Sequence, residues 1–95
     1  MLKLNDKSLL VERCLVNGEW IGRPTEPVVN PATGETIASV PNLGADEAEL
    51  AVSAAQAAFP RWTGLTAKQR AGTLRKWFDL IIENKDDIAV LLTAE

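Results

Sequence analysis

The strongest constraint on the fold of this chain is a six-residue segment rich in turn-forming residues, Asn30-Pro31-Ala32-Thr33-Gly34-Glu35. It lies between two runs of residues typical of β-strands, at positions 27–30 and 36–40. Pro31 fixes its own φ angle near the value that a turn requires, and Gly34 can adopt the left-handed conformation. We therefore predict a β-hairpin whose two strands are joined by this segment.

A second hairpin is predicted upstream, where the dipeptide Asn17-Gly18 separates β-type residues that begin at Cys14 from others that begin at Glu19. Asn-Gly tolerates positive φ angles and is typical of tight hairpin turns. The preceding residues 1–12 carry charges of both signs, and we expect them to form a loose arm or a short helical turn.

After the second predicted hairpin, the apolar residues recur at helical instead of strand spacing. A first, alanine-rich helix is predicted to begin near Ala45 and to end at Pro60. Thr66 and Gln69 have the spacing of a capping box and predict the start of a second helix. This helix has an apolar stripe, which consists of Ala67, Ala71, Leu74, Trp77, Phe78, Ile81 and Ile82.

A third helix is predicted from a cap at Asn84 and Asp87, and no stop signal follows before Glu95. The open end favours a chain that continues. The predicted fold class is α+β, with short antiparallel β-hairpins followed by three helices. We divide the chain into an N-terminal arm, a β-hairpin region and a helical region, at residues 1–12, 13–41 and 42–95.

Composition narrows the class of protein. The 95 residues are 46% hydrophobic and 24% charged, with a net charge of −3, which is typical of a globular protein. The acidic balance argues against nucleic acid as a partner. No apolar run approaches the ~20 residues that a membrane span requires. A single cysteine and the absence of an apolar block at the start favour a cytoplasmic location.

The groups that usually perform catalysis are scarce. The chain has no histidine, and its one thiol, Cys14, opens an apolar strand, so an inert packed cysteine is favoured over a nucleophile. The adjacent carboxylates Asp46/Glu47 and Asp86/Asp87 stand at helix starts, where capping and solvation explain them. No glycine-rich phosphate-binding motif is present. We predict no catalytic and no coenzyme-binding residue in this chain.

Two further groups of side chains have competing interpretations. The basic residues Lys68, Arg70, Arg75 and Lys76 could bind nucleic acid, but the overall acidic balance favours the solvated side of an amphipathic helix. The three tryptophans are expected to be core or interface anchors. For Trp77 we expect a buried ring whose loss costs ~3–5 kcal/mol.

Four motifs, taken in order along the chain, resemble the amino-terminal segment of NAD(P)-dependent aldehyde dehydrogenases: Asn17-Gly18-Glu19-Trp20, Asn30 to Glu35, Phe59-Pro60-Arg61-Trp62 and Leu65 to Arg70. The branch that the chain most resembles is succinate-semialdehyde dehydrogenase, over about residues 15–95. The resemblance implies part of a coenzyme domain whose Rossmann-like α/β sheet is formed by later residues. It also implies that the cysteine nucleophile, the general base and the NAD or NADP site lie beyond Glu95, so that the isolated chain binds no coenzyme and is not competent alone.

The same resemblance implies one site within the chain. Many enzymes of this family hold a structural Na⁺ or K⁺, and their ligand positions match the backbone carbonyls of Val28 and Val29 and the carboxylate of Glu95. Oxygen donors of this kind suit a hard cation. Further ligands would come from later residues.

Three hypotheses follow for the function. The first is an aldehyde dehydrogenase fragment whose partner is the remainder of its own polypeptide and whose parent enzyme oxidises succinate semialdehyde to succinate. The second is a small interaction module without enzymatic activity that self-associates through exposed helix faces. The third, a nucleic-acid binder that uses the second helix, is disfavoured by charge.

Overall fold

The computed structural model describes residues 2–95 and contains two β-hairpins and three α-helices. A short 3-10 helix, η1, precedes them within the N-terminal arm. In chain order the elements are η1 Lys7–Leu9, β1 Cys14–Val16, β2 Glu19–Ile21, β3 Glu26–Val29, β4 Thr36–Val40, α1 Ala45–Thr63, α2 Ala67–Glu83 and α3 Lys85–Ala94. The predicted α+β class, with hairpins followed by three helices, is confirmed.

The first hairpin pairs β1 with β2 in antiparallel register, with Cys14 opposite Ile21 and Val16 opposite Glu19. Its two-residue turn has positive φ angles at both Asn17 (52°) and Gly18 (76°). Such a turn matches the natural twist of the strands, which is why Asn-Gly predicts it so well.

The second hairpin pairs β3 with β4, and an irregularity in register lies between Val28 and Val29. Its connection is closed by two backbone hydrogen bonds of 2.8 Å, from the Asn30 N–H to the Glu35 carbonyl and from the Gly34 N–H to the Asn30 carbonyl. The Asn30 side-chain oxygen also accepts the Ala32 N–H at 2.9 Å. Gly34 has a φ of 76°, as the sequence predicts.

Helix α1 does not end at Pro60, so that prediction was wrong. The helix continues to Thr63, with Pro60 inside its final turn. A proline removes one helical hydrogen bond and crowds the carbonyl four residues earlier, but it does not stop the residues that follow it from being helical. The Thr63 hydroxyl donates to the Phe59 carbonyl at 3.1 Å, and the Gly64 N–H donates to the Pro60 carbonyl at 3.0 Å. These bonds satisfy carbonyls of the last turn.

Helix α2 begins with the predicted capping box. The Gln69 N–H donates to the Thr66 hydroxyl oxygen at 3.2 Å, and the Thr66 N–H donates to the Gln69 side-chain oxygen at 2.9 Å. The α1–α2 corner is also held by Arg70, which is half-buried and donates to the carbonyls of Leu65 and Thr63. The N-terminus of α1 has only half of such a capping box, because glycine has no side chain to accept a bond. The Gly44 N–H donates to the Glu47 carboxylate at 3.1 Å.

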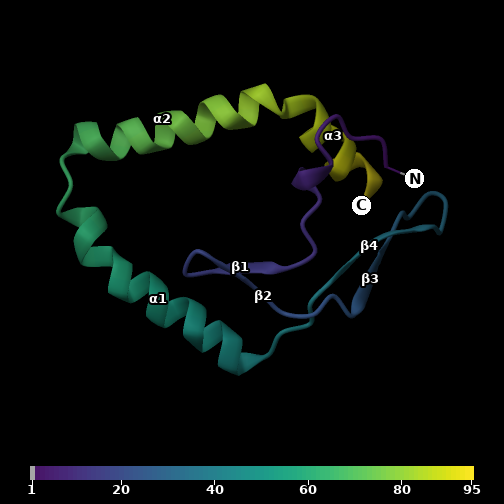
Figure 1. Cartoon of the computed structure of the whole chain (residues 1–95), viewed down its shortest axis with the longest axis horizontal. Coiled ribbons are helices and arrows are strands. Elements are labelled where there is room, and N and C mark those ends of the chain that lie inside the picture. The colour runs from purple at the N-terminus through teal and green to yellow at the C-terminus, as the bar shows by residue number, and fades with distance from the viewer. Residues whose placement is uncertain (1) are drawn as a thin grey trace.

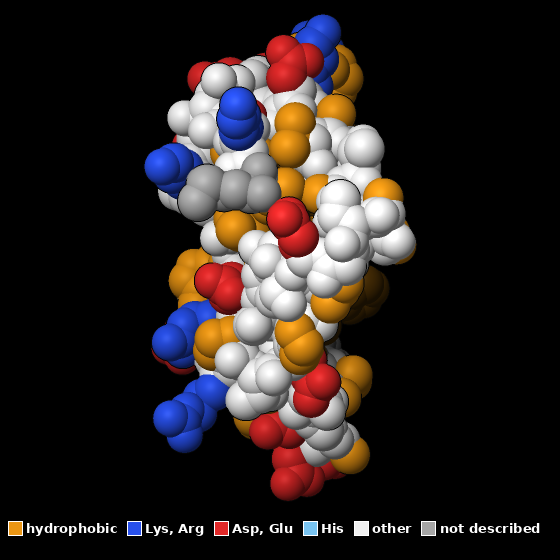
Figure 2. Space-filling view, turned by 90° about the vertical axis from the view of Figure 1, so that its right-hand side faces the viewer, with side chains coloured by type: hydrophobic (Ala, Val, Ile, Leu, Met, Phe, Trp, Pro, Cys, Tyr) orange, Lys and Arg blue, Asp and Glu red, His pale blue; other side chains and the backbone are white. Residues whose placement is uncertain are grey.

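The elements form an open frame instead of a closed globule (Figure 1). Helices α1 and α2 diverge from their shared corner, the first hairpin lies beside α1, and α3 folds back at the far end of α2. The molecule measures 48 × 34 × 18 Å, so its thinnest dimension is less than two helix diameters. Hydrophobic side chains lie among charged ones along the whole face that Figure 2 shows.

Hardly any side chain is removed from solvent. Across residues 2–95, Ala94 is the one hydrophobic residue that is buried, and Asp87 is the one buried polar residue. The surface area of 7765 Å² exceeds the ~5,400 Å² expected for a compact monomer of this mass. The excess, about 2,400 Å², is comparable with the area that an obligate protein interface covers.

The expectation that Trp77 is buried was wrong for this chain, because the residue is 64% exposed. The other residues of the apolar stripe on α2 are exposed too, including Leu74, Phe78, Ile81 and Ile82. The stripe has correct helical periodicity, but within residues 2–95 no layer of structure covers it. The 3–5 kcal/mol expected for a buried tryptophan therefore does not apply to the chain by itself.

Gly22 generates a prediction about local stability. Its φ is +92°, and a Cβ at this position would lie 2.7 Å from the Pro41 Cβ and 3.2 Å from a Leu43 methyl carbon. Gly22→Ala should therefore add about 1–3 kcal/mol of steric cost to the roughly 1–2 kcal/mol of the left-handed conformation. Thermal denaturation measures the effect.

Gly18→Ala is the matched control, because Gly18 has a φ of +76° and open space around its Cβ position. Only the conformational cost should appear there. Equal losses of melting temperature in the two variants would show that the contact between the first hairpin and Pro41 is absent in solution.

Candidate functional site

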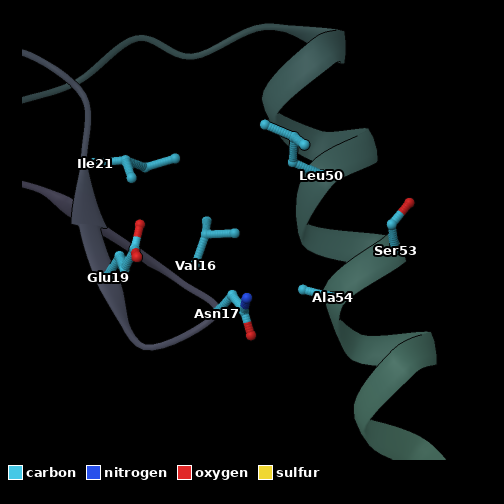
Figure 3. Close-up of a pocket in the computed structure, with 7 residues that line it drawn as sticks. All are labelled: Val16, Asn17, Glu19, Ile21, Leu50, Ser53 and Ala54. Atoms are coloured by element: carbon cyan, nitrogen blue, oxygen red, sulfur yellow. The ribbon is translucent and has the colours of Figure 1, made fainter.

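A shallow groove of about 400 Å³ lies between the first hairpin and α1. Val16 and Ile21 point from the hairpin toward Leu50 and Ala54 on the helix (Figure 3). The polar lining consists of Asn17, Glu19 and Ser53. These side chains include no pair suited to acid–base or nucleophilic chemistry.

A second hollow, of about 480 Å³, lies between the turn of the second hairpin and α3. It is lined by Asn30, Ala32, Ala89, Val90, Thr93 and Ala94. The hollow shows that the last turn of α3 faces the Asn-Pro turn, although about sixty residues separate them in the sequence. The structure thereby brings together the two elements that carry the predicted cation ligands.

Val28 and Val29 end β3 directly before that turn, and Glu95 follows α3 directly. Val28 is half-buried, whereas Val29 and Glu95 are exposed. Two carbonyls and a carboxylate match the ligand chemistry of a hard cation but fill only part of its coordination shell. Over the described part of the chain, no group of three or more His, Cys, Asp or Glu residues could hold a metal ion. The Val28, Val29 and Glu95 site stays a prediction.

Asp87 has a role different from the predicted cap of α3. Its carboxylate accepts the backbone N–H groups of Asn5 and Asp6, each at 2.9 Å and each on a separate oxygen. The side chain is only 5% exposed. No local sequence pattern indicates these bonds, because their partners lie more than eighty residues away.

Cys14 is half-buried and pairs with Ile21 across the first hairpin. Because the sequence contains no histidine, the commonest base that could activate a thiol is missing. The position agrees with the predicted packed cysteine.

The basic patch on α2 is divided among different tasks. One guanidinium nitrogen of Arg70 donates to the carbonyls of Thr63 and Leu65 at the α1–α2 corner. Arg75 lies 3.3 Å from Asp79 and stacks 4.8 Å from the Phe78 ring centre. Lys68 and Lys76 are exposed. This arrangement is the solvated side of a helix, as the acidic composition suggests.

None of the described helices is both long enough and apolar enough to cross a membrane.

Comparison with known proteins gives the same family over the whole chain. The model of the aldehyde dehydrogenase family matches residues 20–95. The chain is 48% identical to succinate-semialdehyde dehydrogenase [NADP(+)] GabD of Escherichia coli K12, over 99% of the chain and 20% of that protein. It is 50% identical to glutarate-semialdehyde dehydrogenase of Pseudomonas aeruginosa PAO1, with the same two coverages.

Among solved structures, the crystal structure of an aldehyde dehydrogenase from Brucella melitensis biovar abortus 2308 superposes with a TM-score of 0.94 at 50% identity. The match covers 99% of this chain and 20% of that one. The chain thus spans about a fifth of the length of the relatives it matches, in their amino-terminal segment. By the family model and by these relatives, the chain belongs to the aldehyde dehydrogenase family.

Proposed function

We propose that this chain is the amino-terminal part of an NAD(P)-dependent aldehyde dehydrogenase that converts succinate semialdehyde to succinate. The observation that carries the proposal is the match over 99% of the chain to a fifth of a succinate-semialdehyde dehydrogenase. In this proposal the segment contributes structure to the coenzyme domain, and the reacting groups come from the rest of the polypeptide.

The exposed apolar surface supports this role. The excess area of about 2,400 Å² is large for a self-sufficient domain. Most of the large hydrophobic side chains that are exposed lie on the helices, among them Trp77, Leu74 and Phe78 of the α2 stripe. Periodic apolar faces of this kind are built to pack against another layer of structure. The proposed layer is the remainder of the same enzyme.

In this proposal the segment supplies no part of the nucleotide site. The sequence has no glycine-rich phosphate-binding loop, and the α1 N-terminus follows a single glycine, Gly44. The lining of neither groove offers a catalytic pair. We therefore assign the coenzyme, the nucleophile and the base of the proposed enzyme to residues outside this segment.

The substrate class is proposed from the relatives. Succinate semialdehyde and glutarate semialdehyde, named for the two relatives above, are short aldehydes that carry a carboxylate at the opposite end. Identities of 48% and 50% do not separate them. The shared chemistry, an aldehyde with a remote carboxylate, is the firmer part of the proposal, and succinate semialdehyde is its specific form.

A monovalent cation is a further part of the proposal. The convergence of α3 with the Asn30 turn supports a site at the Val28 and Val29 carbonyls and the Glu95 carboxylate. The cation would hold the end of α3 against the second hairpin. A cytoplasmic location is proposed from the composition, with its single free cysteine.

Activity measurements test the enzymatic proposal. The protein at its natural length should reduce NAD⁺ or NADP⁺ with succinate semialdehyde, and the 95-residue chain alone should reduce neither. Glutarate semialdehyde, which also carries a remote carboxylate, is compared as an alternative substrate. Acetaldehyde lacks a carboxylate and is the control, for which turnover should be slower. Turnover by the 95-residue chain, or equal turnover of all three aldehydes, would contradict the proposal.

Self-association is the second candidate function, and the same uncovered helix faces favour it. The isolated chain should form oligomers whose proportion rises with concentration in light-scattering measurements. Trp77→Gln should shift the equilibrium toward monomer, because it removes the largest exposed ring of α2.

Lys76→Gln is the control for this experiment, since the neighbouring side chain is polar and exposed. A monodisperse monomer at high concentration would remove the interaction-module hypothesis. Oligomers that form equally well in both variants would show that α2 is not the interface.

A further inference from the structure

The N-terminal arm, described over residues 2–12, and the adjacent Arg13 link α3 to both hairpins through hydrogen bonds. At one end, the backbone N–H groups of Asn5 and Asp6 donate to the buried Asp87 carboxylate of α3. The half-buried side chains Leu4, Leu9 and Leu10 follow the same path along the arm. In Figure 1 the arm wraps α3 before it runs to the first hairpin.

At its other end the arm is bonded to both hairpins. The Glu12 carboxylate accepts the Ser39 N–H of β4 at 2.7 Å, and the Arg13 guanidinium donates to the Gly22 carbonyl beside β2 at 3.0 Å. The segment between the two ends is itself ordered. The Asp6 carboxylate accepts the Ser8 hydroxyl at 2.6 Å and the Ser8 N–H at 3.0 Å, and these bonds lower the pKa of Asp6.

Helix α3 has little else to fix its direction within residues 2–95. Its N-cap residue, Asn84, makes no side-chain cap bond to α3, and its amide nitrogen instead donates back to the Leu80 carbonyl of α2 at 2.9 Å. The opposite end of α3 faces the Asn30 turn across a hollow, and Ala94 at this end is buried. A helix of ten residues is marginal by itself, so contacts from outside α3 contribute to holding it.

We propose that the arm is a strap that sets the position of α3 relative to the second hairpin, with Asp87 as the positioning residue that holds the strap. The carboxylate binds the N–H groups of two consecutive residues at once, so it recognises a bend of the backbone that brings both groups to one side, and not particular side chains. The strap thereby determines how closely the end of α3 approaches the Asn30 turn. This inference rests on hydrogen bonds of the chain itself and does not require the proposed enzymatic activity.

Hydrogen–deuterium exchange in the protein at its natural length tests the strap. Asp87→Asn removes the charge and one of the two acceptor oxygens, so exchange should accelerate at least about tenfold in peptides that cover residues 2–10 and 84–95. Asp86→Asn is the matched control, because Asp86 has the same helix-start position but is exposed. Unchanged exchange in the arm of the Asp87→Asn protein would overturn the proposal.

Deletion of residues 2–6 gives a second test that leaves Asp87 in place. Exchange in α3 should rise as it does in the Asp87→Asn protein, and adding Asp87→Asn to the deletion should cause little further change. If α3 exchange stays the same in the deletion variant, the arm does not position α3. If the two changes add in full, Asp87 acts through another contact, and this result too would contradict the strap.

Discussion

The rest of this structure depends on one constraint: the chain has more apolar surface than its own described residues bury. Burial of apolar area is the main driving force of folding, at about 25 cal/mol per Å². Here Ala94 is the one hydrophobic residue among positions 2–95 that is buried, and tryptophan, phenylalanine and leucine side chains on α1 and α2 face solvent. The apolar residues of α2 recur at helical spacing, and our proposal is that another layer of structure covers them. The chain belongs to the aldehyde dehydrogenase family and spans about a fifth of its relatives. We therefore propose that this layer is formed by the remainder of the same enzyme.

Local interactions define the elements even though the core is thin. The Asn17-Gly18 turn, the bonds within the Asn30 connection and the Thr66 capping box each act over a few residues. Such interactions specify where a strand turns or a helix begins, but each contributes only about 1 kcal/mol. Long-range order in this chain comes from a few contacts, among which the Asp87 bonds to the arm span the greatest sequence distance.

The features that the sequence predicts well are those governed by neighbouring residues. Both hairpin turns and the start of α2 follow from the φ preferences of asparagine and glycine and from capping chemistry. The predicted end of α1 at Pro60 is wrong because the residues after a proline can still form helical hydrogen bonds. The role of Asp87 had no local signal, because a carboxylate at a helix start resembles a cap whether or not a distant backbone binds it. The exposure of Trp77 could not be inferred either, since helical periodicity identifies an apolar face but not whether other residues cover it.

The solvent accessibility of Trp77 tests the central claim most directly. With Trp20 and Trp62 replaced by phenylalanine, acrylamide quenching of the remaining tryptophan fluorescence can be compared between the 95-residue chain and the protein at its natural length. The account predicts strong quenching in the isolated chain, where the ring is 64% exposed, and marked protection in the longer protein. Equal quenching in both would contradict the claim that the apolar face of α2 is covered by the remainder of the enzyme.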